Sequence, residues 1–401
     1  MGDVILDEVL LSVFVAPHSY TGENVVEISC HGSLFIQQQL LQLLAGKGAR
    51  HAEAGEFTLR AFMNKKFDLS QAEAVADLIA SNSATSHQVA MQHMRGGFSE
   101  KIKVLRDNLV NFASLVELEL DFSEEDVEFA NRDDLKKLVL SMQKVIQRLI
   151  DSYEVGNVIK NGIPVAIVGK PNAGKSTLLN ILLEEDRAIV SEIPGTTRDT
   201  IEDEISIDGV LFRFIDTAGI RDTSDAIEAM GVSKTFEKIK KSSIIVYMFD
   251  VHELSTKELQ TELDELKNHI IDSQVIVAAN KIDKEDIAYL KKEFSHFPGI
   301  LFISAKEKQG IDELKKRFVE MFDSKTVNIT ETVVTNARHI QALMNSSVSL
   351  SKVFDGLNKN ASGELLATDI RSTLHHLGLI TGEVTTEDLL GNIFSRFCIG
   401  K

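Results

Sequence analysis

The spacing of apolar side chains changes along the 401-residue chain and separates it into parts of different character. The first 64 residues mix two short β-like runs, Val4–Ala16 and Asn24–Cys30, with one helical piece, Leu34–Leu44. This pattern predicts a small α/β domain. No glycine-rich turn or capping signal precedes the first run, so we expect the later portion of a sheet domain whose beginning is absent.

Two further stretches predict amphipathic helices. Residues 65–160 contain the alanine-rich segment Asp68–Ala84, then apolar positions at steps of three and four, then a predicted helix at Asp133–Tyr153. After Lys325 the pattern returns in Thr335–Asn358, Gly363–Leu379 and Thr386–Phe397. Because each stretch alone leaves an apolar face uncovered, we expect residues 65–160 and 325–401 to form one helical domain.

Residues 161–324 alternate strands with helices, which is typical of a mostly parallel α/β sheet. Continuous apolar runs predict strands that are covered on both faces, at 164–169, 242–250, 273–280 and 299–304. Residues 201–216 instead predict a hairpin that turns at Asp208-Gly209. We therefore predict a multidomain protein of the α+β and α/β classes, in which a Ras-like P-loop domain is inserted into the helical domain.

The amino-acid composition limits the classes of protein to which this chain can belong. The chain is 43% hydrophobic, enough for several cores, and its net charge of -17 argues against a broad nucleic-acid-binding face. The longest apolar run, Ile244–Phe249, is too short to span a membrane, and no export signal opens the chain. Cys30 and Cys398 are far apart and in no metal or redox spacing. These features predict a soluble cytoplasmic protein without a disulfide.

The run VAIVGKPNAGKST matches the phosphate-binding P-loop, directly after a predicted strand and before a predicted helix. The spacing of the motif identifies its defining residues as Gly169, Gly174, Lys175 and Ser176. Glycines let backbone N–H groups surround phosphates, Lys175 reaches the β and γ oxygens, and Ser176 ligates Mg²⁺. This run therefore predicts a nucleotide-triphosphate site.

Four further motifs, PGTTRD, DTAG, NKID and ISAK, follow in the order found in GTPases. Thr197 would complete the Mg²⁺ shell only with a γ-phosphate present, Asp216 would support the metal, and the Gly219 N–H would face the γ-phosphate. Asp283 can accept two hydrogen bonds from guanine, and the Ala305 N–H could meet guanine O6. The predicted GTP-binding residues are Asn172, Ala173, Gly174, Lys175, Ser176, Thr177, Ser191, Thr196, Thr197, Asp216, Thr217, Ala218, Gly219, Asn280, Lys281, Asp283, Ser304, Ala305 and Lys306.

Ile220 stands where Ras-like enzymes carry a glutamine that orients the attacking water. An isoleucine cannot hold a water, so either the backbone orients it and hydrolysis is slow, or a nearby acid does. Asp222, Asp225 and Glu228 are within reach along the chain, and the residues alone do not choose among them.

Several long stretches together resemble the MnmE (TrmE) family of tRNA-modification GTPases, over essentially the whole chain. The stretches are SYTGENVVEISCHG, AGEFTLRAFMNKKFDLSQAEAVADLI, GKPNAGKSTLLN, PGTTRDTIE, DTAGIRDTSDAIEAMG and the terminal CIGK. The resemblance implies an N-terminal folate-binding domain at 1–64, a helical domain built from 65–160 and 325–401, and a G domain at 161–324. It also implies a homodimer whose G domains meet when GTP and K⁺ are bound.

The resemblance assigns roles around the phosphates. It selects Glu228 as the acid that acts on the attacking water through a bridging water, and it offers Arg221 for steadying the loop, although a plain solvated arginine is equally consistent. Lys175 is the third predicted catalytic residue. The resemblance also implies that a K⁺ ion supplies the charge that an arginine finger provides in other GTPases. Its implied ligands are Asn172, Ser191, Ile193 and Thr196.

The implied reaction installs an aminomethyl or carboxymethylaminomethyl group at C5 of the tRNA wobble uridine. It uses a tetrahydrofolate derivative and a heterotetramer with an FAD-dependent partner of the MnmG (GidA) type. Glu27, Lys66 and Lys401 match the folate-contacting positions. Other family positions lie upstream of Met1, so we expect an N-terminally incomplete copy.

Two alternatives stay open. Cys398 could be a nucleophile near the folate or a small buried hydrophobe. The alternative function is a ribosome-assembly GTPase of the Era or Der type, which would need a basic appended domain.

Overall fold

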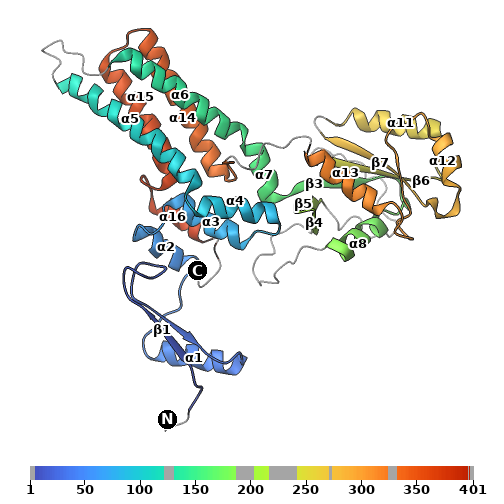
Figure 1. Cartoon of the computed structure of the whole chain (residues 1–401), viewed down its shortest axis with the longest axis horizontal. Helices are drawn as coiled ribbons and strands as arrows, with labels where there is room; N and C mark the ends of the chain where they lie inside the picture. Colours follow the sequence, from blue (N-terminus) through green and yellow to red (C-terminus); the bar gives the residue numbers. More distant parts are fainter. Residues whose placement is uncertain are drawn as a thin grey trace. The chain divides into compact units, whose positions relative to one another are not determined.

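The computed structural model describes residues 5–121, 131–186, 203–215, 242–270, 273–323, 332–395 and 397. The chain divides into two compact units (Figure 1). The first comprises Met1–Ala80, Ala90–Asp151 and Ala337–Lys401, and the second comprises Ser81–Val89 and Ser152–Asn336. The four domain boundaries expected from the sequence stay predictions. Among the described residues, no helix is both long and apolar enough to cross a membrane.

The elements of the first unit come from both ends of the chain. They are β1 (Leu10–Phe14), β2 (Val25–Ser29), α1 (Leu34–Gly46), α2 (Glu56–Met63), α3 (Leu69–Ile79), α5 (Gly97–Asp121), α6 (Arg132–Asp151), α14 (Ala337–Asn358), α15 (Gly363–Thr381) and α16 (Glu387–Phe394). Helix α4 (Ala84–Met94) begins in the second unit and ends in the first.

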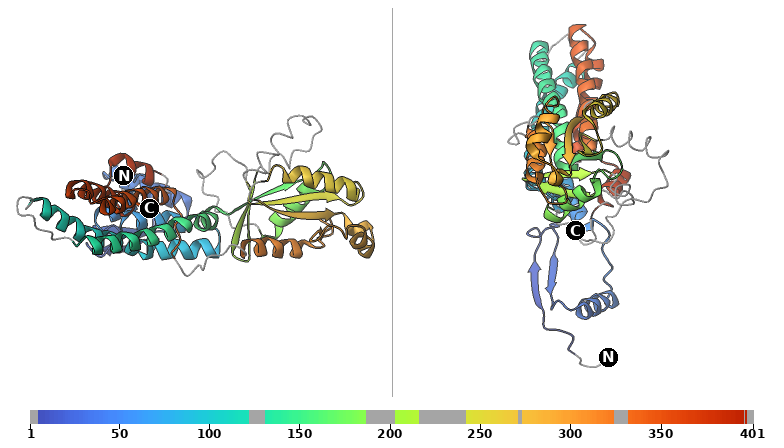
Figure 2. Two further views of the ribbon diagram at one scale, coloured as in Figure 1. Left: turned by 90° about the horizontal axis from the view of Figure 1, so that it is seen from above. Right: turned by 90° about the vertical axis from the view of Figure 1, so that its right-hand side faces the viewer.

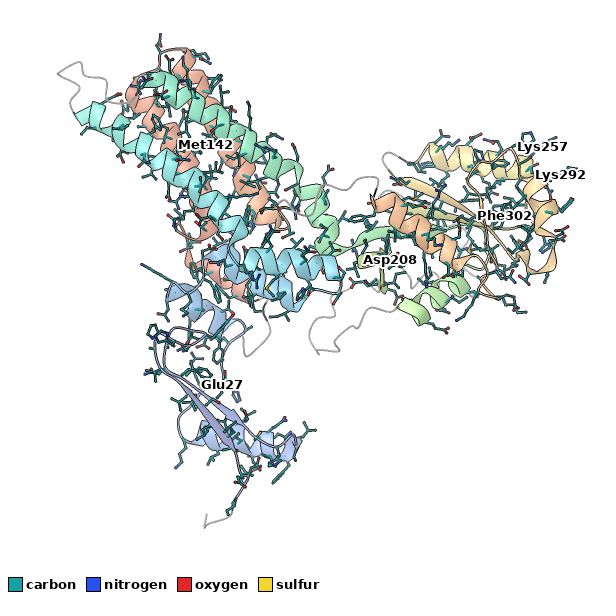
Figure 3. The ribbon with its side chains drawn as sticks, viewed as in Figure 1. Glu27, Met142, Asp208, Lys257, Lys292 and Phe302 are labelled. Carbon is teal, nitrogen blue, oxygen red and sulfur yellow. The ribbon has the colours of Figure 1, made fainter. Side chains whose placement is uncertain are left out.

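Four long helices, α5, α6, α14 and α15, lie side by side (Figures 1 and 2). Helix α14 contacts α15 and α6, and α15 contacts α5. Helix α6 shows why they associate, because its buried side chains recur at steps of four and three and form one stripe. They are Leu135, Val139, Met142, Ile146 and Leu149. Met142 lies in the middle of this stripe (Figure 3). The amphipathic pattern predicted from the sequence is confirmed.

A buried charged cluster ties the two flanks of the chain together. The Glu73 carboxylate of α3 accepts hydrogen bonds from Arg338 Nη2 at 2.6 Å and Nε at 3.0 Å, and it lies 2.8 Å from His339 Nε2. Arg338 also donates to the Leu379 and Ile380 carbonyls of α15. Burial raises the pKa of Glu73, but His339 and Arg338 outweigh it and lower the pKa to about 2. The expected helical domain built from two distant segments is therefore confirmed.

The start of the chain has little core of its own among the described residues. β1 and β2 pair antiparallel, with Leu10 opposite Ser29 and Phe14 opposite Val25. No residue of β1, β2 or α1 is buried. The β-like run Val4–Ala16 shortens to β1 because only those five residues pair with β2.

Two helix predictions need correction, and one helix was not predicted. The single helix predicted at Asp133–Tyr153 ends at Asp151, and a separate helix, α7 (Tyr153–Asn161), follows. The alanine-rich segment breaks before α4, where the Ser83 hydroxyl accepts from the Ser86 N–H and competes with helix continuation. Helix α2 was missed. It is short, and it starts after Gly55, whose φ of 69° is left-handed.

The second unit is a six-stranded sheet with helices on both faces (Figure 1). Its strands are β3 (Ile163–Val168), β4 (Asp203–Ile207), β5 (Val210–Phe214), β6 (Ile244–Asp250), β7 (Gln274–Asn280) and β8 (Leu301–Phe302). Its other elements are α7, α8 (Lys175–Asp186), α11 (Thr256–Lys267), the 3₁₀ turn η1 (Ile282–Lys284), α12 (Ile287–Glu293) and α13 (Ile311–Asp323). The strand order is β4-β5-β3-β6-β7-β8, and only β4 and β5 pair antiparallel.

Successive side chains of the central strands point to opposite faces of the sheet and pack into two separate hydrophobic cores. In β6, Ile244, Val246 and Met248 pack with α8 and α13 on one face. Ile245, Tyr247 and Phe249 pack with α11 and α12 on the other. Every residue of β6 is buried, as its continuous apolar run predicted.

The β4–β5 hairpin turns at Asp208 and Gly209, with φ of 49° and 81° (Figure 3). Two positive φ values are what a tight two-residue hairpin turn requires, so this prediction is confirmed. The start of α4 holds the hairpin, because Thr85 Oγ1 donates to the Gly209 carbonyl at 3.0 Å. Asn82 Nδ2 also donates to Glu204 at 3.1 Å.

Both ends of the inserted segment are joined within the second unit. The Val334 N–H donates to Ser152 Oγ at 3.0 Å, so this serine binds the returning chain instead of capping α7. Gly156 makes the approach possible, because a Cβ there would lie 2.1 Å from the Val334 carbonyl oxygen. Val334 is fully buried. The segment Ser152–Asn336 therefore begins and ends at one packed junction.

We predict that Gly156→Ala destabilises the protein by about 2 kcal/mol, because the added methyl must displace backbone. Urea unfolding followed by circular dichroism measures this. Gly391→Ala is the matched control, since it too lies in a helix but has nothing within 4 Å of its added Cβ. Equal stability of the two variants would contradict a tight junction.

Candidate GTP site

The P-loop runs from the end of β3 to the start of α8 and has a backbone that few residues can adopt. Gly169 has φ of 146°, and a Cβ there would lie 1.9 Å from the Met248 carbonyl oxygen. Gly174 has φ of 98°, and its Cβ would lie 2.2 Å from Asn280 Nδ2. Asn172 also lies at a positive φ, 62°. The two glycines of the motif are therefore required by close approach as well as by φ.

Lys175, the first residue of α8, folds back over the loop. Its Nζ donates to the Gly169 carbonyl at 2.9 Å and to the Lys170 carbonyl at 2.6 Å. The ammonium group thus lies over the loop whose backbone would surround phosphates, at the start of a helix whose dipole favours an anion.

Asn280, at the end of β7, joins two loops to each other. Its Nδ2 donates to the Ala173 carbonyl of the P-loop at 2.7 Å, and its Oδ1 accepts from the Ala305 N–H at 2.9 Å. Asn280 is only 2% exposed, so both hydrogen bonds are shielded from water. The structure therefore brings the predicted phosphate loop and the two predicted base loops together at the carboxyl ends of parallel strands, where such sheets bind ligands.

The base-recognition carboxylate is held in place. Ser304 Oγ donates to Asp283 Oδ1 at 2.6 Å, and this hydrogen bond lowers the pKa of Asp283. The Asp283 carboxylate is ionised near neutral pH and can accept the two donors of a guanine edge. Lys306 is a neighbouring exposed residue, 3.5 Å from Glu307.

Asp250, the last residue of β6, is a participant that the sequence reasoning missed. It lies opposite Asn280 in the strand register, and its Oδ2 is 2.6 Å from Lys281 Nζ. Burial raises the pKa of Asp250, but hydrogen bonds from Lys281 and the His252 N–H outweigh it, so its pKa lies below the usual value. Lys281 has a left-handed φ of 69°. The sequence did contain a signal for this residue: Asp250 is an aspartate at the end of an apolar run that precedes the NKID run.

The remaining predicted site residues lie outside the described residues. They are Ser191, Ile193, Thr196, Thr197, Asp216, Thr217, Ala218, Gly219, Arg221, Glu228, Lys401 and Cys398, and Ile220 is also among them. Ser176 and Thr177 are described and follow Lys175 in the first turn of α8.

Sequence comparison with known proteins covers the whole chain. The model of the MnmE helical domain matches residues 69–398, and the model of the GTP-binding protein TrmE N-terminus matches residues 1–66. The tRNA modification GTPase MnmE of Christiangramia forsetii is 56% identical over all of this chain and 87% of its own length. That of Cytophaga hutchinsonii is 57% identical over 99% of this chain and 86% of its own.

The chain belongs to the MnmE family of tRNA modification GTPases. It is accordingly a GTP-hydrolysing enzyme with the multidomain fold predicted from its sequence. Membership of this family also decides against the ribosome-assembly GTPase that the sequence left as the alternative.

Solved structures similar to this chain include two GTPases. The G domain of the T. maritima FeoB iron transporter is 25% identical and covers 40% of this chain and 98% of its own, with a TM-score of 0.29. Aquifex aeolicus Era, bound to GDP and aluminium fluoride, is 27% identical and covers 46% of this chain and 66% of its own, with a TM-score of 0.30. Likenesses of this strength add nothing to the family assignment.

The folate candidates that the structure describes lie in the first unit. Glu27 is an exposed residue of β2 (Figure 3), and the exposed Lys66 donates from Nζ to the Pro17 carbonyl at 3.1 Å. Within the described part of the chain, no hydrogen bond or ion pair joins Glu27 to Lys66. Their role in folate binding stays a prediction.

We predict that Asp250→Asn weakens binding of a fluorescent GDP analogue about tenfold, because Lys281 loses its charged partner beside the base loop. Titration of the full-length variant measures the Kd. Asp264→Asn is the control, since its pair with Lys267 lies on the exposed side of α11. An unchanged Kd for Asp250→Asn would show that the pair only stabilises the fold.

Proposed function

We propose that this GTPase acts in tRNA modification, at C5 of the wobble uridine. The observation that carries the proposal is the extent of the family match, 56% identity over the whole chain to a tRNA modification GTPase. An FAD-dependent partner of the MnmG type would install the aminomethyl or carboxymethylaminomethyl group in a heterotetramer with a homodimer of this chain, in the cytoplasm. The net charge of -17 supports a division of labour in which the partner supplies much of the tRNA-binding surface.

The loop geometry supports the nucleotide roles. Lys175 would leave the Gly169 and Lys170 carbonyls and turn to the β and γ phosphates, which offer its ammonium stronger acceptors. The Ser176 hydroxyl is a hard oxygen ligand suited to Mg²⁺, and Thr197 would complete the shell. When bound, Mg²⁺ would neutralise charge on the phosphates. The Asp283 carboxylate would accept hydrogen bonds from the guanine base and so select GTP.

K⁺ would supply the charge that an arginine finger gives in other GTPases. Asn172 supports this role because its side chain is exposed at the loop and lies on a left-handed backbone next to the phosphate cradle. Ser191, Ile193 and Thr196 would provide the other ligands. Glu228 would act on the attacking water through a bridging water, and Arg221 would steady the same loop.

The folate proposal concerns the first 64 residues. Glu27, Lys66 and Lys401 would contact a tetrahydrofolate derivative that donates the one-carbon unit. A folate carries a polar pterin and a glutamate tail, for which carboxylate and ammonium groups are suitable partners. Lys66 has a side chain that is already directed to the Pro17 carbonyl of the β1–β2 connection.

The proposed function predicts restoration of modified wobble uridine in cells that lack their own copy of this GTPase. Expression of the unaltered chain should restore the modified nucleosides. The control variant Lys257→Ala, which changes the exposed surface of α11, should restore them equally well (Figure 3). Lys175→Ala should not restore them, because it removes the phosphate-binding ammonium. Mass spectrometry of tRNA nucleosides measures the outcome. No restoration by a chain that hydrolyses GTP when purified would contradict the proposal.

We expect GTP turnover in K⁺ to exceed turnover in Na⁺ several-fold at equal ionic strength. Phosphate release at saturating GTP measures the ratio. Asn172→Ala should bring the ratio close to one, whereas Asn268→Ala, at the exposed end of α11, should leave it unchanged. Equal rates in both salts for the unaltered chain would rule out the K⁺ assignment.

A further inference from the structure

Three side chains from different elements form a connected chain behind the P-loop. The Tyr247 hydroxyl of β6 donates to Glu262 Oε2 of α11. Glu262 Oε1 lies 2.6 Å from Nζ of Lys170, the second residue of the P-loop motif. The Lys170 carbonyl in turn accepts from Lys175 Nζ at 2.6 Å. A buried strand residue is thereby connected to the lysine that serves the phosphates.

This loop needs restraint at both ends, because residues held at positive φ persist only when their surroundings fix them. Its second half is fixed by the hydrogen bond from Asn280 to the Ala173 carbonyl. Its first half begins at Gly169, where close approach to β6 limits the space but supplies no hydrogen-bonding side chain. Two restraints are observed there among the described residues: the hydrogen bonds from Lys175 Nζ to the Gly169 and Lys170 carbonyls, and the Lys170 side chain held by Glu262. By the proposed function, Lys175 turns to the phosphates when nucleotide binds, which leaves the link through Glu262 in place.

We propose that Glu262 is a positioning residue of the GTP site, which holds the start of the P-loop through Lys170 and is itself held by Tyr247. Among the described residues, no hydrogen bond joins the Glu262 carboxylate to the loop backbone, so Glu262 acts through the lysine. The proposal concerns GTP binding by the enzyme and does not depend on its role in tRNA modification.

The Glu262 end of the ion pair is partly shielded from water, whereas the Lys170 side chain is 48% exposed. The Tyr247 residue is only 5% exposed, and the Glu262 side chain is 25% exposed. The hydrogen bond that Lys170 donates to Glu262 is the largest cause that raises the pKa of Lys170. Glu258, one turn earlier on α11, also acts electrostatically on Lys170, but its carboxylate already accepts from the N–H and hydroxyl of Ser255, at 2.9 and 2.7 Å. It is therefore poorly placed to replace Glu262.

Glu262→Gln tests the proposal, because the amide oxygen still accepts from Tyr247 while the charge that holds Lys170 is lost. We expect GDP and GTP to bind about two- to fivefold more weakly in the full chain, with faster GDP release. The kcat at saturating GTP should change less than twofold. Glu265→Gln on the exposed side of the same helix is the matched control. An unchanged Kd for Glu262→Gln would overturn the proposal.

A double-mutant cycle separates positioning from general stability. Lys170→Met removes the same link from the other side, so the double variant should bind GDP no more weakly than the weaker single variant. Thermal unfolding of all three variants shows whether a change in Kd follows lost stability. Additive effects on Kd, or a Kd that rises in proportion to the stability lost in each variant, would overturn the proposal.

Discussion

The nucleotide site depends on the close approach of the P-loop backbone to β6. Gly169 lies so near the Met248 carbonyl that any side chain would overlap it. Met248 is fully buried in a strand between two cores, so the sheet cannot move aside to accept one. The position of the loop is therefore set by the central sheet, and the loop's side chains only refine it.

Buried polar groups then fix the other nucleotide loops relative to that backbone. Asn280 uses both ends of its amide, one on the P-loop and one on the loop that carries Ala305. Asp250, at the end of the neighbouring strand, holds the loop that carries Lys281 by an ion pair with that lysine. Because an unpaired buried amide or carboxylate is costly, these contacts hold the loops in one arrangement.

The sequence predicted the parts of this structure that follow from local pattern. Continuous apolar runs identified β3, β6 and β7, and the Asp208-Gly209 turn was correct because only positive φ values close so short a hairpin. The loop residues of the P-loop and NKID motifs were placed by their position after strands. Contacts between distant segments carry no local signal. The pairing of Glu73 with Arg338 and His339 joins residues from opposite flanks, and periodicity cannot show which partner a buried charge will find.

The same limit explains why Asp250 and Glu262 were missed. Each is one acidic residue among 60 aspartates and glutamates, and each gains its role from a lysine elsewhere in the chain. Lys170 and Lys281 lie in motifs whose recognised chemistry concerns phosphates and base, so their side-chain partners were not sought. In both pairs a loop lysine is held by an acid on a rigid strand or helix. The motifs thus specify which atoms meet the nucleotide, and the ion pairs behind them hold the loops that carry those atoms.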